Sequence, residues 1–278
     1  MTLSLVGGTD LASRTDGVVI IVPARLDSSR FPGKPLAPLR GADGTPKSLV
    51  QRSWEAARAV APAVPVVIAT DDEGIADAAA AFGATAVLTS PGCRNGTERC
   101  WEAVQAAGID ADIIVNLQGD APLTPPLAVE ALIDTLRADP RLAVATPMIR
   151  CPALMLDRLL CDARSGRVGG TTVVFDRLMN ALYFSKRVIP YVPERTADAP
   201  VHLHIGLYAY RRDVLGHYAE LPPSPLELVE GLEQLRFLDA GIPMRMVEVA
   251  DPPGGLWEVN NPEDIVTVET ALAARRID

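Results

Sequence analysis

The chain has 278 residues, 48% of them apolar, and a formal net charge of −9. This length and apolar content are enough for one large α/β domain, or for a domain with a small lobe. The negative charge argues against nucleic acid as a partner. The sequence contains no run of about 18 apolar residues, so a membrane span is not expected.

The N-terminus lacks the features of an export signal. Residues 1–16 have no basic region followed by a long apolar stretch, and we expect a disordered leader before a single domain over residues 17–278. The four cysteines form no C-x-x-C pair and are expected to be free thiols in a reducing cytoplasm. With three histidines and no tight Cys/His cluster, a zinc site is not expected.

The first strand and the loop after it organise the chain. Val18–Val22 is a short, unbroken apolar run, typical of a buried parallel strand. Arg25, Arg30 and Lys34 follow closely, and they would repel one another unless an anion lies among them. Because ligands bind at the carboxyl ends of strands in open α/β sheets, we interpret this loop as a triphosphate site, with Ser28 and backbone N–H groups adding hydrogen bonds. A solvated basic loop is the alternative, ranked lower because the chain as a whole is acidic.

Strands and helices alternate through the first half of the chain. Buried strands are predicted at residues 65–69, 84–88, 112–117 and 142–146, with helical patterns between them. Such alternation predicts an α/β fold with a doubly wound, mostly parallel sheet and right-handed crossovers.

The pattern loosens in the second half of the chain. Residues 151–212, including a strand at 202–210, predict a smaller antiparallel lobe that closes the site and pairs subunits. A helix at 226–238, a strand at 244–249 and a terminal helix from Pro262 then return to the main layer.

Acidic residues follow two of the predicted strands. Asp120 comes after residues 112–117, where a carboxylate could hold a magnesium ion that bridges triphosphate oxygens. A turn aspartate is the alternative, but the basic loop nearby favours the metal. Asp71 or Asp72, after residues 65–69, could contact a ribose or cap the next helix, and taken alone the cap is favoured.

Three motifs resemble those of nucleotide-sugar cytidylyltransferases. P-A-R-x-x-S-x-R-x-P-G-K-x-L stands at residues 23–36, Q-G-D-x-P at 118–122, and Asn95–Arg99 resembles S-G-T-[ED]-R. Thr97 could also be a helix N-cap, and both roles can hold at once. The predicted catalytic residues are Arg25, Lys34 and Asp120. The predicted nucleotide-binding residues are Pro23, Ala24, Arg25, Ser28, Arg30, Lys34, Asp71, Asn95, Gly96, Thr97, Arg99 and Gln118.

Further motifs extend the resemblance over residues 17–270. They include A-L-Y-F-S at residues 181–185, H-x-G-x-Y-x-Y-R at 204–211, and a Leu/Glu-rich helix pattern at 224–236. The chain is thereby similar to the CMP-Kdo synthetase family, the 3-deoxy-manno-octulosonate cytidylyltransferases. The resemblance implies a nucleotide-diphospho-sugar transferase-like fold and a CTP- and magnesium-dependent, cytoplasmic homodimer.

The resemblance also implies an acceptor site in the lobe and the helix that follows it. The residues concerned are Lys186, His204, Tyr208, Glu233 and Gln234. Taken alone, His204 and Tyr208 would more often be core residues of the lobe, and Glu233 and Gln234 a solvated helix face.

The chain departs from the family pattern around the acceptor and the metal. Ala121 replaces a glutamate, residues 170–174 lack a lysine, and Cys93 replaces a histidine. Asn260 replaces the aspartate that joins the metal site. Its carbonyl oxygen can still bind magnesium, so Asp120 and Asn260 are the predicted metal ligands.

Neutral residues at positions 121 and 260 predict a less negative pocket, which suits an acceptor more anionic than Kdo. A phosphonate carries about two negative charges near neutral pH. Phosphonoformate is therefore a hypothesis that we hold level with Kdo.

The predicted reaction is the transfer of CMP from CTP to a small acidic acceptor. An acceptor oxygen attacks the α-phosphorus and pyrophosphate leaves. Two alternatives remain open: a non-catalytic nucleotide-binding homologue, which Asn260 favours, and a uridylyl- or guanylyltransferase with a related sheet.

Overall fold

The computed structural model describes residues 5–6, 17–27, 30–60, 63–192, 199–252, 255 and 257–278. The chain divides into two compact units, which are described separately. Unit 1 is Met1–Ile133 with Pro252–Asp278, and unit 2 is Asp134–Asp251, which contains the predicted lobe at 151–212. Of the expected leader, residues 1–4 and 7–16 lie outside the described residues, whereas Leu5–Val6 form β1.

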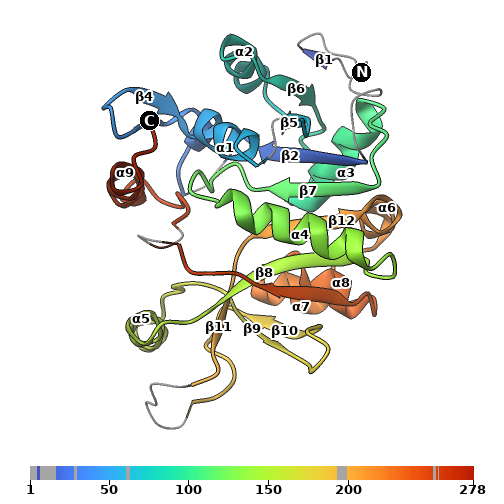
Figure 1. Cartoon of the computed structure of the whole chain (residues 1–278), viewed down its shortest axis with the longest axis vertical. Helices are drawn as coiled ribbons and strands as arrows, with labels where there is room; N and C mark the ends of the chain where they lie inside the picture. The colour runs from blue at the N-terminus through green and yellow to red at the C-terminus, as the bar shows by residue number, and fades with distance from the viewer. Residues whose placement is uncertain are drawn as a thin grey trace. The chain divides into compact units, whose positions relative to one another are not determined.

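The sheet of unit 1 has parallel strands at its centre. β2 (Val18–Ala24) lies between β5 (Val66–Thr70) and β7 (Ile113–Leu117) and is parallel to both (Figure 1). β6 (Thr85–Leu88) continues the parallel order beyond β5, and β1 pairs antiparallel with β6. Every residue of β2, β5 and β7 is buried, as the continuous β-branched runs predict. The predicted α/β class is confirmed.

Helices connect these strands, and side chains fix where each helix begins. They are α1 (Leu49–Arg58), α2 (Glu73–Ala81), α3 (Gly96–Ala106) and α4 (Pro126–Ala138). Ser48 caps α1 by accepting from the Gln51 N–H. Asp72 caps α2 in the same way, so of the two aspartates after β5 it is Asp72 that has the capping role.

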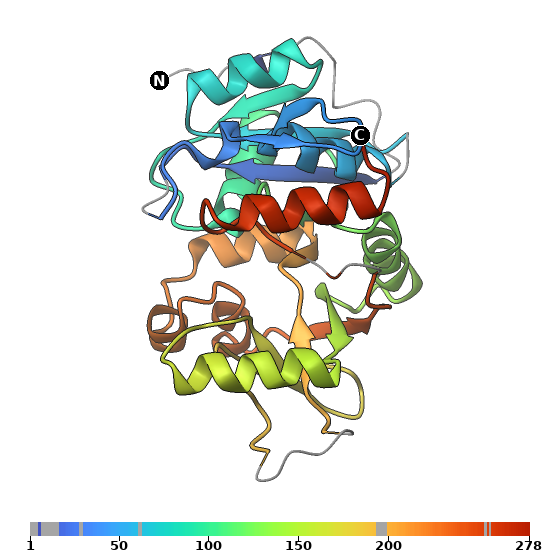
Figure 2. The same ribbon diagram turned by 90° about the vertical axis from the view of Figure 1, so that its left-hand side faces the viewer.

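The C-terminal segment packs into the core of unit 1. The hairpin of β3 (Pro38–Arg40) and β4 (Pro46–Ser48) was not expected from the sequence. It follows the short 3₁₀ helix η2 (Lys34–Leu36) and packs against α9 (Asp264–Ala274), drawn in red in Figure 2. One apolar cluster joins these elements, and its buried members are Leu39, Leu49, Leu123, Val259, Val268, Ala271 and Leu272.

Unit 2 is built mainly from antiparallel strands. They are β8 (Val144–Arg150), β9 (Thr172–Phe175), β10 (Ala181–Ser185), β11 (His202–His204), β12 (Leu207–Arg211) and β13 (Met244–Glu248). β8 is antiparallel to β11 and β12, and β9 to β10 and β11. β13 is parallel to its partner, β8, beside which it runs in Figure 1.

Unit 2 carries four helices in its described part besides the end of α4. They are α5 (Ala153–Arg164), α6 (Arg212–Glu220), α7 (Pro225–Glu230) and α8 (Leu235–Asp239). The helix predicted over 226–238 is two helices, because Gly231 adopts φ 61° and ends α7. The strand predicted over 202–210 is likewise two strands. No helix in the described ranges is long and apolar enough to cross a membrane.

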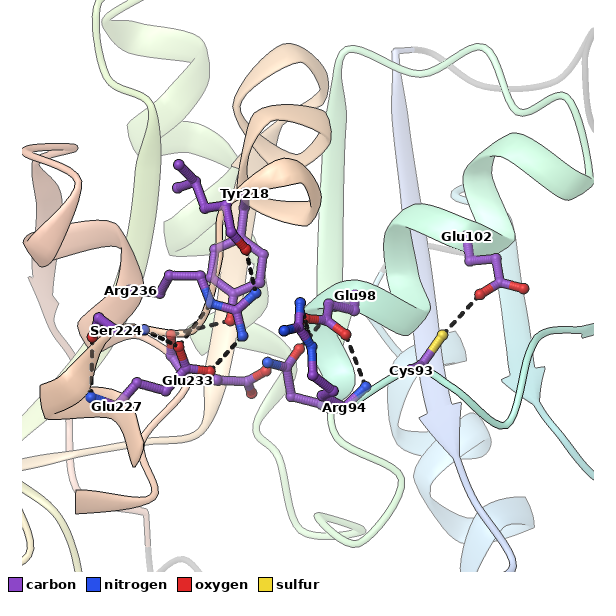
Figure 3. A network of polar contacts seen from close by, with 11 residues as sticks. Cys93, Arg94, Glu98, Glu102, Tyr218, Ser224, Glu227, Glu233 and Arg236 are labelled. Atoms are coloured by element: carbon purple, nitrogen blue, oxygen red, sulfur yellow. Dashed lines mark hydrogen bonds and ion pairs between the residues drawn. The ribbon is translucent and has the colours of Figure 1, made fainter. Parts of the chain in front are cut away.

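A buried ion pair joins α7 to α8. The Arg236 guanidinium, 1% exposed, lies 2.5 Å from a carboxylate oxygen of Glu227 and 4.2 Å from the Tyr218 ring centroid (Figure 3). Ser224 caps α7 in a capping box with Glu227. Arg236 therefore holds the start of α7 against α8.

Removing the Arg236 charge should destabilise the protein strongly. In Arg236→Met the buried Glu227 carboxylate loses its partner, and we expect a loss of about 3–5 kcal/mol in unfolding free energy by urea titration. Arg141→Met is the control, because Arg141 forms an exposed pair with Asp139. A midpoint for Arg236→Met equal to that of Arg141→Met would contradict the structural role of the buried pair.

Candidate active site

The carboxyl ends of β2 and β7 bring an ammonium and a carboxylate together. Lys34 Nζ, from the loop after β2, lies 2.6 Å from Asp120 Oδ2, from the loop after β7. The two side chains are 15% and 24% exposed, so the pair remains open to a ligand. The structure thus joins the two sequence motifs whose residues were predicted to bind phosphate and metal.

Gly119 allows the two loops to approach this closely. A Cβ on Gly119 would lie 2.6 Å from the carbonyl oxygen of Pro23, a distance that no side chain tolerates. The Ser53 hydroxyl of α1 donates to the Gly119 carbonyl at 2.9 Å and holds the loop from the other side. Asp120 is therefore fixed beside the basic loop by its neighbour's lack of a side chain.

The predicted cytidine motif lies against the same edge. A Cβ on Gly96 would lie 3.0 Å from Gln118 Nε2 and 3.3 Å from Pro23 Cγ, so these three residues form one surface. The alternative role considered for Thr97 is wrong: Asn95 is the N-cap of α3, accepting from the Glu98 N–H at 2.9 Å.

Arg99 and Asp71 form a buried ion pair. Arg99 Nη2 lies 2.8 Å from Asp71 Oδ2, and Arg99 Nη1 donates to the Thr89 hydroxyl at 2.6 Å. Arg99 is 3% exposed. The pair joins the loop after β5 to α3 and so helps to set the shape of the predicted nucleotide site.

Cys93 stands where the family pattern has a histidine, and its thiol is held protonated. Burial raises the pKa of Cys93 to about 12, and the hydrogen bond that its thiol donates to Glu102 at 2.9 Å adds to the rise (Figure 3). The neighbouring Arg94 pairs with Glu98 of α3 at 2.6 Å. The thiol is therefore a hydrogen-bond donor and not a nucleophile.

The C-terminal segment adds further polar groups beside Asp120. The Val259 N–H donates to the Asp120 carbonyl at 3.0 Å, and Arg30 Nη2 donates to Asn260 Oδ1 at 3.2 Å. Glu258, which was not expected from the sequence to take part, precedes Val259 directly and is exposed.

Arg25 lies exposed just after the end of β2. Ser28 lies outside the described residues.

Magnesium is held in nucleotide sites by one or two carboxylates together with substrate phosphates. Asp120 is the carboxylate at this edge that could serve such an ion. No group of three or more His, Cys, Asp or Glu side chains that could hold a metal occurs within the described ranges.

In unit 2, three of the predicted acceptor residues form one hydrogen-bonded chain. The Tyr208 hydroxyl donates to Gln234 Oε1 at 3.2 Å, and Gln234 Nε2 lies 3.5 Å from His204 Nδ1. Thr146 donates its only hydroxyl hydrogen to the Leu207 carbonyl, so it accepts from His204 Nε2 at 2.8 Å. These contacts assign a neutral His204 protonated on Nε2, and burial lowers its pKa to about 3.

The remaining acceptor residues are less directly joined to this chain. The Lys186 ammonium lies beside Gly231, where a Cβ would be 2.9 Å from Nζ. The Lys186 backbone N–H donates to Glu230 at 3.0 Å. Glu233 accepts at its backbone carbonyl from the Tyr218 hydroxyl at 3.2 Å.

Thr172, in the segment that lacks the family's lysine, is part of the core. Its hydroxyl donates to the Arg187 carbonyl at 2.6 Å and accepts from the Ile189 N–H at 3.1 Å, and the residue is 1% exposed. The loss of the lysine therefore leaves an internally satisfied hydroxyl.

Cations and a carboxylate meet at an edge where a parallel sheet binds ligands, and this arrangement is suited to the phosphates of a nucleotide. Nucleotidyl transfer is the chemistry that the fold and this site define together.

Comparisons with known proteins narrow this class. The family model for cytidylyltransferases matches residues 19–246. A 3-deoxy-manno-octulosonate cytidylyltransferase from Maricaulis maris (strain MCS10) is 49% identical, covering 92% of this chain and 97% of its own. One from Chlorobium limicola (strain DSM 245 / NBRC 103803 / 6330) is 45% identical, covering 91% and 96%. A solved structure of CMP:2-keto-3-deoxy-manno-octonic acid synthetase complexed with CTP has a TM-score of 0.78 and 39% identity, covering 93% and 99%. The chain therefore belongs to the cytidylyltransferase family, among the CMP-Kdo synthetases.

Replacing Lys34 should reduce CTP turnover while leaving the fold intact. Lys34→Met removes the ammonium that faces Asp120, and we expect kcat/KM for CTP to fall about 100-fold or more, measured as pyrophosphate release. Lys47→Met is the matched control, because Lys47 pairs with Glu55 at 2.9 Å on the β4–α1 side of unit 1. Equal rates for the two variants would exclude the predicted role of Lys34.

The half-buried, neutral His204 should make stability depend on pH. The unfolded chain binds a proton at His204 below about pH 6.5 and the folded protein does not, so folding stability falls as pH drops below that value. Relative to His204→Gln, the wild type should lose up to about 1.4 kcal/mol of unfolding free energy per pH unit between pH 6.5 and 5. His217→Gln, which changes an exposed imidazole, should follow the wild type. Parallel curves for wild type and His204→Gln would disprove the neutral state.

Proposed function

We propose that the protein transfers CMP from CTP to 3-deoxy-manno-octulosonate and releases pyrophosphate. The observation that carries the proposal is the Lys34–Asp120 pair at the carboxyl edge of the parallel sheet. It is supported by relatives that carry this acceptor in their names and are 45–49% identical over nearly the full chain.

The proposed reaction depends on positioning and charge neutralisation. An acceptor hydroxyl oxygen forms a bond to the α-phosphorus, the bond from that phosphorus to the β-phosphate oxygen breaks, and the hydroxyl proton passes to solvent. Lys34, Arg25 and Arg30 offset the negative charge of the triphosphate, and Asp120 would hold magnesium. When bound, magnesium would neutralise phosphate charge and lower the pKa of the attacking hydroxyl.

The residues proposed for the acceptor lie in unit 2. In the Tyr208–Gln234–His204 chain, each group is oriented by the next, and His204 stays uncharged. A neutral, pre-oriented polar set suits the hydroxyl groups of a sugar, and the Lys186 ammonium suits its carboxylate. Association as a homodimer remains part of the proposal.

The phosphonate hypothesis rests on two neutral residues. It counts Ala121 and Asn260 as lost carboxylates. The relatives name Kdo as their acceptor, and they are 45–49% identical over nearly the full chain. Kdo is therefore the better proposal.

Pyrophosphate release from CTP and magnesium, with Kdo and phosphonoformate offered separately, tests the proposal. We expect turnover with Kdo and at least about 100-fold lower kcat/KM with phosphonoformate. Turnover with phosphonoformate alone would overturn the acceptor assignment. CTP binding without turnover on any acidic acceptor would identify a non-catalytic homologue. Stabilisation by UTP or GTP above that by CTP in a thermal shift assay would overturn the nucleotide assignment.

A further inference from the structure

A buried hydroxyl group in unit 2 contacts both a backbone carbonyl and the ring of His204. Thr146 lies in β8 and is fully buried. Its Oγ1 is 2.8 Å from the carbonyl oxygen of Leu207 and 2.8 Å from His204 Nε2. Because a hydroxyl has a single hydrogen, it can donate to only one of these two groups. The group that receives this hydrogen decides the tautomer of His204.

The backbone fixes where the hydrogen of Thr146 goes. The antiparallel register of β12 with β8 places Leu207 opposite Pro147. Proline has no N–H, so the Leu207 carbonyl receives no ladder hydrogen bond from that position, and the Thr146 hydroxyl supplies the missing donor. Thr146 therefore presents a lone pair to His204, and the imidazole must donate from Nε2.

The other ring nitrogen of His204 then carries a lone pair. In a neutral imidazole that is protonated on Nε2, Nδ1 can only accept a hydrogen bond. Gln234 Nε2 lies 3.5 Å from Nδ1, a distance at the outer limit for a hydrogen bond, so the lone pair is weakly satisfied. The Tyr208 hydroxyl donates to Gln234 Oε1 and so keeps the amide nitrogen on the side of His204.

Two aromatic rings hold the plane of this imidazole. Phe184, which is fully buried, lies edge-on to His204 with ring centroids 4.8 Å apart. Tyr208 lies 5.5 Å from His204 in a tilted arrangement. His204 itself is half-buried, so a ligand can reach a ring whose orientation is already set.

We propose that Thr146 is a positioning residue that holds His204 in the Nε2–H tautomer, so that Nδ1 accepts a hydrogen bond from a hydroxyl group of the acceptor. A sugar hydroxyl can donate to this lone pair, whereas an ionised carboxylate or phosphonate oxygen has no hydrogen to donate. His204 thereby favours a hydroxyl-bearing acceptor over a small anion. This inference rests on the proposed function, and it names the group of the acceptor that His204 recognises.

The tautomer can be measured without turnover. In the ¹⁵N-labelled full chain, long-range correlations between ring nitrogens and ring C–H hydrogens distinguish an Nε2–H from an Nδ1–H imidazole. The signals of His204 are those that disappear in His204→Gln. We expect Nε2–H in the wild type and in Thr146→Ser, which keeps the hydroxyl. In Thr146→Val the Nδ1–H tautomer should appear, because Nε2 has lost its acceptor and Nδ1 can donate to a rotated Gln234 amide.

Thr172→Val is the matched control for this measurement. Thr172 is also a buried threonine of unit 2, and its hydroxyl donates to the Arg187 carbonyl and accepts from the Ile189 N–H. The variant removes a buried hydroxyl whose partners are backbone groups, so the tautomer of His204 should stay as in the wild type. A change to Nδ1–H in Thr172→Val would indicate a general loosening of unit 2 and would contradict a specific role of Thr146.

Kinetics show whether the tautomer matters for the acceptor. Because one hydrogen bond to the acceptor is lost, KM for Kdo should rise about tenfold in Thr146→Val and return to within about twofold of the wild type in Thr146→Ser. KM for CTP should change by less than about twofold in both variants, because the residues predicted to bind the nucleotide belong to unit 1.

An Nδ1–H imidazole at His204 in the wild type would overturn the proposal, whether or not any variant folds. So would an unchanged tautomer in Thr146→Val, or a changed tautomer with an unchanged KM for Kdo. These failures differ from a failure of the proposed function. A wild-type protein with the Nε2–H tautomer that does not transfer CMP to Kdo would refute that function, whereas a Kdo transferase with the Nδ1–H tautomer would refute only the role of Thr146.

Discussion

The close approach of the loops after β2 and β7 is the constraint on which the nucleotide site depends. Ion pairing between Lys34 and Asp120 is favourable only if both backbones are held still, and a side chain at Gly119 would prevent the approach. Contacts to the Asp120 loop from Ser53 and Val259 fix it from two directions. The site is therefore pre-organised by elements that do not touch the ligand, so little ordering remains to be done when a nucleotide binds.

Much of this architecture could be predicted because its signals are local. Continuous apolar runs marked β2, β5 and β7, and the residues that follow a parallel strand must lie at the ligand edge. The motifs at residues 23–36 and 118–122 were therefore placed together correctly. The features that escaped prediction depend on neighbours distant in sequence or on single dihedral angles. Gly231 divides one predicted helix into two through its positive φ, and the β3–β4 hairpin is supported by packing against α9.

The candidate site shows the same limit. The hydrogen bond from the Val259 N–H to the Asp120 carbonyl joins segments far apart in sequence, and no local signal predicts it. Similarly, Thr97 has the residue type of an N-cap, but Asn95 takes that role because it precedes Gly96, where α3 begins.

The apolar cluster around Val259 also affects how the protein is made. Leu39 and Leu49 leave the ribosome early, whereas Val259, Val268 and Leu272 follow only after all of unit 2 has been synthesised. Unit 1 therefore cannot complete its core while Met1–Ile133, its first segment, is being translated. Contacts of such long sequence separation also form slowly. A nascent chain would expose Leu39 and Leu49 until the C-terminal segment arrives. The hydrogen bond from Val259 to the Asp120 carbonyl forms in the same late step, so assembly of the site is coupled to completion of the core.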